Sequence, residues 1–155
     1  MEIRLQPIGS VDNQFLERIP EGWETALTQI VIDPQWLPAL YGIEQFSHLI
    51  VLFWLDRIPE QGIELQVHPE NRQDVPLVGL FATRTPYRPN RIGLQVVELV
   101  SRQASILSVR GLDALHGSPV VDIKPYLPRG DCVPAARTPA WLDKLWAERG
   151  AQGDP

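Results

Sequence analysis

The stretch Phe81-Ala-Thr-Arg-Thr-Pro-Tyr-Arg-Pro-Asn-Arg-Ile-Gly-Leu94 places three arginines between two apolar runs. An interrupted apolar run, Val75–Phe81, precedes the arginines, and a second run, Ile92–Val100, follows them. Pro86 and Pro89 stiffen the turn, because proline fixes φ and favours an extended conformation in the residue before it. The pattern predicts two strands joined by a rigid turn that presents its arginines. Two interpretations of this turn stay open: a platform for an anion and a solvated hairpin tip.

Further short apolar runs fill the rest of the chain, and Gly, Pro, Asn and Asp separate them. This pattern indicates a mainly β (α+β) domain, and fifteen prolines leave little room for long helices. Alternation within Ser105–Leu112 predicts Arg110 on the polar face, opposite Leu107 and Val109. The strands that we expect lie at about Glu2–Ile8, Ala26–Ile32, Phe46–Leu55, Ile63–Val67, Leu77–Thr83, Ile92–Val100, Ser105–Leu112 and Pro119–Ile123.

Two helices are predicted from their capping residues. The first lies near 34–41, where an Asp-Pro pair opens it and a glycine follows its end. The second lies near 139–149, with Thr138 as its cap, proline in its first position and Gly150 at its end. Its apolar residues form one stripe, which we expect to pack on the strand domain or on a partner chain. The stripe consists of Trp141, Leu142, Leu145 and Trp146.

Length and composition favour one domain of modest size. The chain has 155 residues, of which 44% are hydrophobic, and single domains commonly have ~100–200 residues. We expect one domain over 1–150, a frayed tail over 151–155 and no C-terminal extension domain. The net charge of −5 excludes a surface that binds phosphate everywhere, so nucleic acid would have to contact a local basic patch. A single cysteine, Cys132, and the lack of a long apolar segment favour a cytoplasmic protein with no membrane contact.

Sequence motifs for common nucleotide and metal sites are missing. Neither G-x-G-x-x-G after a strand nor G-x-x-x-x-G-K-[ST] occurs, which argues against a Rossmann or P-loop site. His48, His68 and His116 are too far apart to show metal-ligand spacing, so we expect no metal. Because His48 lies in an apolar run, we expect a buried, hydrogen-bonded side chain there rather than a ligand.

Three segments combine polar side chains with turn residues: the end of the most apolar run, the arginine turn, and the segment Arg110–Tyr126. In the third segment, Gly111 and Gly117 permit close approach of the backbone. Asp122 and Lys124 alternate with apolar residues, so they share one face of a strand. They can pair there as a structural salt bridge or serve a functional role.

Taken together, these segments resemble the TsaA/TrmO-like family of S-adenosylmethionine-dependent methyltransferases. The resemblance rests on GIEQFSHLIVLFWLDR at 42–57, FATRTPYRPNRIGL at 81–94 and GLDALHGSPVVDIKPYLP at 111–128, and it covers more than half of the chain. It implies a small single-sheeted β-barrel that works as a homodimer. It further implies methylation of N6 of threonylcarbamoyladenosine at position 37 of tRNA, with S-adenosyl-L-methionine as the cofactor.

The resemblance also assigns site residues, through their match to the motifs of the family. The cofactor-binding residues are Asp56, Arg57, Arg84, Leu94, Arg110, Gly111, Leu112 and Asp113. The residues assigned to the nucleic acid are Arg88, Asn90, Lys124 and Tyr126. No catalytic residue is assigned, although N6 of such a substrate must lose a proton and therefore needs a base.

The side chains of these residues suit the chemical groups of the cofactor. Its α-carboxylate needs a cation, which Arg84 or Arg57 can supply as a two-pronged donor. Its α-ammonium and ribose hydroxyls need acceptors, for which Asp113 and Asp56 are candidates. Backbone groups of the segment that begins at Arg110 can contact the edge of the adenine.

The chain departs from the family pattern at three places. Many members have a P-R-Q cofactor contact near the N-terminus, where this chain reads Phe15–Trp23 with Arg18 as a candidate substitute. The usual N-P-I-G becomes N-R-I-G, with Arg91 in place of proline, and D-G-T-P becomes His116–Pro119. Two other functions stay open as well: an S-adenosylmethionine-binding regulatory or sensor protein without RNA methylation, and a methyltransferase of a small metabolite.

Overall fold

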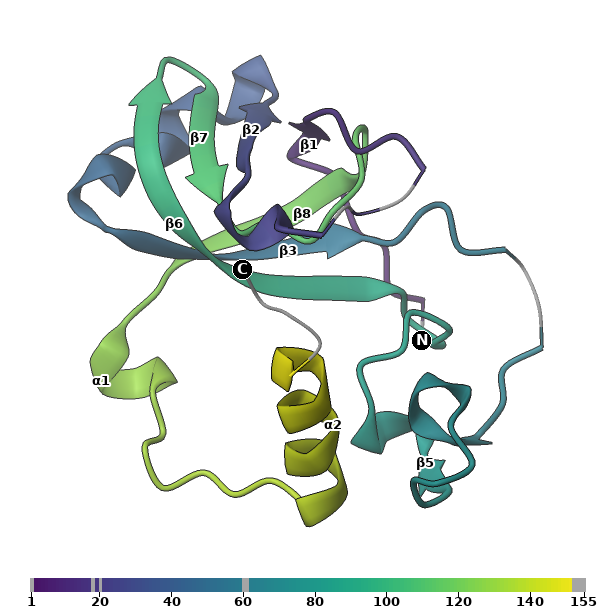
Figure 1. Ribbon diagram of the computed structural model, residues 1–155. Helices are drawn as coiled ribbons and strands as arrows, with labels where there is room; N and C mark the ends of the chain where they lie inside the picture. Colours follow the sequence, from purple (N-terminus) through teal and green to yellow (C-terminus); the bar gives the residue numbers. More distant parts are fainter. Residues whose placement is uncertain (1, 18, 20, 60–61, 152–155) are drawn as a thin grey trace.

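A closed antiparallel β-barrel dominates the computed structural model, which describes residues 2–17, 19, 21–59 and 62–151 (Figure 1). The order of strands around the barrel is β1-β2-β7-β6-β3-β8, and β1 closes the barrel by pairing with both β2 and β8. The mainly β barrel expected from the sequence is therefore confirmed. The barrel strands are β1 (Gly9–Asp12), β2 (Leu27–Ile32), β3 (His48–Trp54), β6 (Ile92–Gln103), β7 (Ile106–Arg110) and β8 (Pro119–Pro125).

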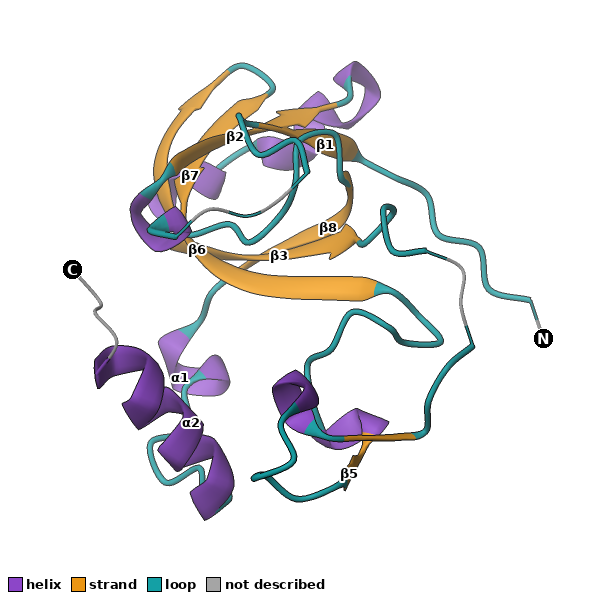
Figure 2. Ribbon diagram, turned by 45° about the vertical axis from the view of Figure 1, so that its right-hand side comes forward, coloured by secondary structure: helices purple, strands orange, loops and turns teal. Residues whose placement is uncertain are grey.

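Outside the barrel lie a two-stranded sheet, two α-helices and several 3₁₀ helices (Figure 2). The sheet pairs β4 (Gln66–Val67) with β5 (Val78–Gly79), and the α-helices are α1 (Pro128–Asp131) and α2 (Ala140–Ala151). The 3₁₀ helices are Trp23–Thr25, Pro34–Leu40, Ile43–Gln45, Pro69–Asn71 and Leu80–Ala82. None of the helices in the described part of the chain is long and apolar enough to cross a membrane.

Alternation of side chains along β3 helps to fill the barrel core. Leu49, Val51 and Phe53 are buried, whereas His48 is exposed and its Nδ1 lies 2.9 Å from the hydroxyl of Ser47. The expectation of a buried His48 is wrong, because a strand turns every second side chain outward even within an apolar run. The same alternation is confirmed in β7, where the predicted polar face is the outer one.

Three of the expected strands are wrong in whole or in part, and in one of them, Ile63–Val67, only Gln66–Val67 forms a strand. Glu2–Ile8 forms no strand, and Ile3 and Leu5 are exposed. The strand begins at Gly9 instead, and within the described part of the preceding segment only Ile8 bonds to the barrel backbone, through its N–H to Val120 and its carbonyl from Asp33. Leu77–Thr83 contains only the two residues of β5 before the chain turns into a 3₁₀ helix, and β5 pairs with β4 rather than with β6. The arginine turn is therefore not the tip of a hairpin.

Both expected helices exist, with differences in type and length. Pro34–Leu40 is a 3₁₀ helix rather than an α-helix, and Pro38 inside it has no N–H to donate. Helix α2 continues one residue past Gly150. The hydroxyl of Thr138, the predicted cap residue, donates to the carboxylate of Asp143 at 2.6 Å, so it bonds to a side chain near the start of the helix.

Helix α2 packs beside the segment that carries β4 and β5 rather than on the barrel, so of the two expected packing partners the barrel is excluded (Figures 1 and 2). Arg72 joins the two parts, with its Nη1 2.6 Å from the carboxylate of Glu148. The Arg72 guanidinium also holds the pKa of Asp74 well below its usual range. Trp146 of the predicted apolar stripe is exposed. The buried apolar residues of this region lie outside the core cluster of the barrel and are Val75, Leu80 and Leu145.

The alternating strand directions bring six strand ends together, and we call this side of the barrel the loop end. Strands β1, β3 and β7 finish here, and β2, β6 and β8 begin here, because every pair in the barrel is antiparallel. The strand-terminal residues at the loop end are Asp12, Leu27, Trp54, Ile92, Arg110 and Pro119.

Candidate functional site

Hydrogen bonds of Arg57 join three loops at the loop end. Its Nη2 donates to the carbonyl of His116 at 2.5 Å, and its Nη1 donates to the carbonyl of Leu16. Next to it, the hydroxyl of Ser118 donates to the Asp56 carboxylate at 3.5 Å. The structure thus brings Asp56 and Arg57 to the loop that connects β7 to β8. The sequence did not indicate Leu16, and His116 and Ser118 were noted only within a longer motif.

Two glycines set the backbone conformation of the loop between β7 and β8. Gly111 and Gly117 have φ of 79° and 82°, in the left-handed region that favours glycine. A Cβ on Gly111 would lie 3.3 Å from the carbonyl oxygen of Glu24, so this backbone also runs close to its neighbour. Leu112 is fully buried in the barrel core. Because Leu112 anchors the loop, the position of Asp113 is restricted.

Asp113 has a carboxylate without a partner. It makes no hydrogen bond or ion pair to any of the residues that the structure describes. Partial burial raises the pKa of Asp113, and the nearby carboxylate of Glu24 raises it further. A partly desolvated, unpaired carboxylate is suited to receive a cationic group of a ligand.

Asp113→Asn is expected to stabilise the protein at neutral pH. A carboxyl with a raised pKa binds its proton more tightly in the folded state, so stability falls as pH rises from the ordinary aspartate value to the raised one. The amide cannot ionise, and this loss of stability disappears. Melting curves between pH 3 and 7 should show a flatter dependence for the variant, with Asp33→Asn as the control. If the melting temperature of Asp113→Asn depended on pH as strongly as that of the wild type, the destabilisation could not be assigned to the Asp113 carboxylate.

A cleft of about 350 Å³ opens beside this loop, between the 3₁₀ helix Trp23–Thr25 and the outer face of β6 and β7. Arg110 and Gly111 take part in its lining. Arg110 is already neutralised, because its Nη1 lies 3.1 Å from the Glu98 carboxylate. The residues that line this cleft are Trp23, Glu24, Thr25, His48, Gln95, Val96, Glu98, Arg110 and Gly111.

The three arginines of the turn before β6 differ in their contacts. Arg88 donates to the carbonyl of Thr83 at 2.8 Å, and Arg91 donates to the carbonyl of Ile58 at 2.6 Å. Arg84 is exposed and has no hydrogen bond or ion pair with the described part of the chain. Arg84 therefore has the one guanidinium of the three that is fully available to a ligand.

The other residues assigned from the resemblance lie on β6, at the end of β8 and in the arginine turn. Leu94 is on the outer face of β6, opposite Leu52, with 52% of its surface exposed. Lys124 pairs with Asp122 at 2.6 Å, so the predicted ion pair of these two residues is confirmed. Lys124 and Tyr126 follow β8 away from the loop end. Asn90 is exposed in the arginine turn, and Arg18 lies outside the described residues.

Comparison with known proteins gives a consistent result. Residues 15–132 match the model of the tRNA-methyltransferase O N-terminal domain. A probable S-adenosyl-L-methionine-binding protein of Methanothermobacter thermautotrophicus is 45% identical over 130 residues, which are 81% of this chain and 91% of that protein. The tRNA (adenine(37)-N6)-methyltransferase of Escherichia coli is 42% identical over 102 residues, 63% of this chain but only 43% of that protein. The crystal structure of TrmO from Pseudomonas aeruginosa has a TM-score of 0.70 and 35% identity, and the match covers 88% of this chain and 62% of that one.

Proposed function

The chain belongs to the family of tRNA-methyltransferase O N-terminal domains, and on that premise we propose that it methylates N6 of threonylcarbamoyladenosine at position 37 of tRNA. The observation that supports the site most directly is the unpaired carboxylate of Asp113 on its rigid loop. The relatives named as S-adenosyl-L-methionine-binding proteins and methyltransferases support S-adenosylmethionine as the cofactor.

We assign the groups of this cofactor by the chemistry of the side chains, not always in the roles that the sequence suggested. Asp113 suits the α-ammonium group, and the available guanidinium of Arg84 suits the α-carboxylate. The loop backbone at Gly111 suits the edge of the adenine. Arg57 and Arg110 already hold partners within the chain, so we assign to them the positioning of loops rather than charge recognition.

The chain contributes to methyl transfer mainly by positioning and by excluding water. Bound S-adenosylmethionine supplies an electrophilic methyl group. The transfer is an in-line displacement, so its rate depends on holding the acceptor nitrogen behind that methyl at close range. The loops tied together by Arg57 and anchored by Leu112 provide a rigid frame for this alignment. A frame that is already ordered loses less conformational entropy when the ligands bind.

Uncompensated positive charge gathers in the loops at the loop end, which supports an RNA partner. Arg72, Arg102, Arg110, Lys124 and Lys144 each pair with a carboxylate. Among the arginines whose side chains the structure describes, six have no acidic partner: those at 57, 84, 88 and 91 lie between β3 and β6, whereas Arg129 and Arg137 follow β8. Arginine is well suited to phosphate, and RNA affinity depends strongly on such contacts. We assign phosphate contacts to Arg88 and Asn90. Lys124 is already paired with Asp122, and Tyr126 lies against His48, which lines the cleft beside Arg110.

We further propose that the protein is a homodimer through the outer face of β3 and β6. The β6 residues on this face are unusually apolar, with 38% of Ile92, 52% of Leu94 and 39% of Val96 exposed. A second copy on this face would bury them and bring Leu94 against another molecule. Sedimentation velocity at several protein concentrations tests this assembly.

Methylation of tRNA is tested with methyl-labelled S-adenosylmethionine, total tRNA and mass spectrometry of the nucleosides. We expect N6-methylated threonylcarbamoyladenosine, and its absence would refute the proposed substrate. Calorimetry on the same samples measures binding of S-adenosylmethionine and so separates cofactor binding from methylation of tRNA. Binding without methylation of any RNA would identify a sensor protein instead.

Arg84→Ala is expected to weaken binding of S-adenosylmethionine about tenfold or more, since a hydrogen bond to a charged group contributes about 1.5–3 kcal/mol. The melting temperature should not change, because Arg84 is exposed and has no partner in the described chain. Arg84→Lys keeps the charge but not the two-pronged geometry and should recover only part of the affinity. An unchanged dissociation constant for Arg84→Ala would remove Arg84 from the site.

A further inference from the structure

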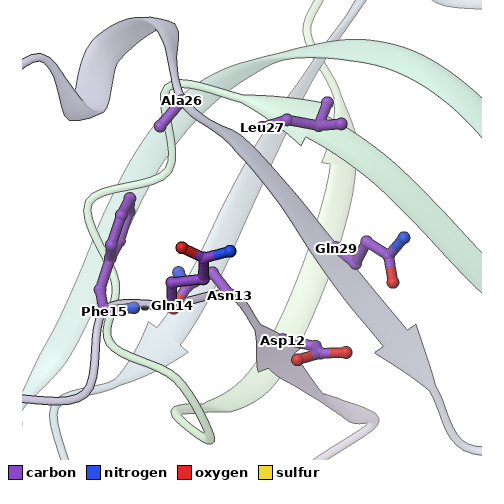
Figure 3. Close-up of a pocket in the computed structure, with 7 residues that line it drawn as sticks. All are labelled: Asp12, Asn13, Gln14, Phe15, Ala26, Leu27 and Gln29. Carbon is purple, nitrogen blue, oxygen red and sulfur yellow. Dashed lines mark hydrogen bonds between the residues drawn. The ribbon is translucent and has the colours of Figure 1, made fainter.

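A second cleft opens at the loop end, where the chain leaves β1 and enters β2 (Figure 3). Its volume is about 460 Å³. Figure 3 shows Phe15 and Ala26 on one side, Asp12 and Gln29 on the other, and the Asn13 and Gln14 amides between them. The residues that line this cleft are Asp12, Asn13, Gln14, Phe15, Ala26, Leu27 and Gln29.

This second cleft is attached to the loop that carries Asp113. The amide Nδ2 of Asn13 donates to the carbonyl of Ala114 at 3.0 Å, and the backbone N–H of His116 donates to the carbonyl of Phe15 at 2.8 Å. Within the cleft wall, the N–H of Phe15 donates to Oδ1 of Asn13 at 2.9 Å. The backbone of Phe15 is therefore held from two directions, immediately beside the loop assigned to the cofactor.

The chemistry of the lining suits a neutral planar ring. The amides of Gln14 and Gln29 each offer a donor and an acceptor, and they have no side-chain hydrogen bond to the described residues. Phe15 adds an aromatic surface. No basic residue lines the cleft and Asp12 would repel an anion, so the cleft suits the ring alone, and the threonyl carboxylate on N6 of the proposed substrate must point out of it. Proteins recognise unpaired bases by stacking on aromatic rings and by hydrogen bonds to base edges.

We propose that this second cleft receives the acceptor nucleobase, an unpaired purine that stacks on Phe15 and presents its edge to Gln14 and Gln29. The proposal rests on the proposed methyltransferase function and adds the place of the acceptor. Since Ala114 follows Asp113 directly and its carbonyl accepts from Asn13, a hydrogen bond joins the wall of the cleft to the cofactor loop. The base and the cofactor would then meet across the loop at Asp113–His116.

Phe15→Leu tests this proposal, because leucine keeps an apolar side chain but removes the aromatic face. The probe is an anticodon stem-loop RNA with 2-aminopurine at position 37, whose fluorescence reports stacking of that base. We expect Phe15→Leu to lose the fluorescence change on binding and to raise KM for tRNA with threonylcarbamoyladenosine at position 37 about tenfold, as one lost base–aromatic stack implies. Phe15→Trp should restore both, and the dissociation constant of S-adenosylmethionine should stay at its wild-type value in each variant.

Phe46→Leu is the matched control, since Phe46 is also a partly exposed phenylalanine but precedes β3 at the opposite end of the barrel. An unchanged KM and an unchanged 2-aminopurine signal in Phe15→Leu, with active wild-type enzyme, would overturn the cleft assignment alone. Loss of cofactor binding or of thermal stability in Phe15→Leu would assign Phe15 a structural role and overturn it as well. Wild-type protein that neither methylates nor binds the RNA would refute the proposed function together with the cleft.

Discussion

Arg57→Ala is expected to lower the affinity for S-adenosylmethionine on the order of 100-fold, since it removes two charge-assisted hydrogen bonds at once. These bonds tie the turn after β3 to the carbonyls of Leu16 and His116. Without them the loop that carries Asp113 loses one of its supports. The loss is expected although both of these bonds go to carbonyls of the chain itself, which makes Arg57 a positioning residue. Calorimetric titration of the cofactor measures the effect.

Two controls separate positioning from a loss of charge. Arg129→Ala removes an exposed arginine outside the loop end and should leave affinity unchanged. Arg57→Lys keeps the charge but cannot reach both carbonyls, so it should behave more like the alanine variant than like the wild type. Amide hydrogen exchange of residues 113–117 should rise in Arg57→Ala. Slow exchange in that variant, together with weak cofactor binding, would assign Arg57 to direct contact instead.

Gly9→Ala is expected to cost about 3 kcal/mol of folding free energy or more, at the upper end of the usual effects of overpacking. A Cβ at this position would lie 2.2 Å from the backbone oxygen of Val31 and 2.9 Å from Cα of Ile32. These are backbone atoms of β2, so no side chain can rotate away. Gly9 also pairs with Val120 of β8, and its displacement would open the barrel at its closing strand.

Thermal unfolding should show the effect of Gly9→Ala as a drop of about 10 °C, since 1 kcal/mol corresponds to roughly 2–4 °C in a chain of this size. Gly62→Ala is the matched control, because a Cβ there would meet no atom within 4 Å and no strand would be disturbed. A melting temperature for Gly9→Ala within a degree or two of the control would show that β1 and β2 can separate without cost.

The fold class could be predicted from the sequence because short apolar runs and turn residues are local signals. The same signals failed where pairing partners decide the outcome. Glu2–Ile8 looks like a strand by composition, but β1 takes the closing position in the barrel. Leu77–Thr83 looks like a strand as well, but its backbone turns into a 3₁₀ helix after β5. Which runs pair, and in what register, depends on contacts between distant residues that no local pattern contains.

The candidate site could be predicted as a set of segments but not as a set of roles. Asp56, Arg57 and the loop at Gly111 do lie together at the loop end. The sequence could not show that Arg57 and Arg110 bind groups of the chain itself, whereas Arg84 does not. An arginine motif specifies where charge can be placed, and hydrogen bonding to carbonyls from other segments decides whether that charge is available. The second cleft had no sequence signal, since its amides belong to no motif.

Closure of the barrel limits how this protein can associate with other molecules. Every barrel strand has two neighbours, but β7 pairs with β6 only from Glu98 onward, so the stretch 92–97 has a strand partner on one side alone. A partner could extend the sheet by strand addition only at such a stretch. Elsewhere recognition depends on side chains and loops, and single substitutions on the outer surface should alter specificity while the hydrogen bonds of the sheet stay intact.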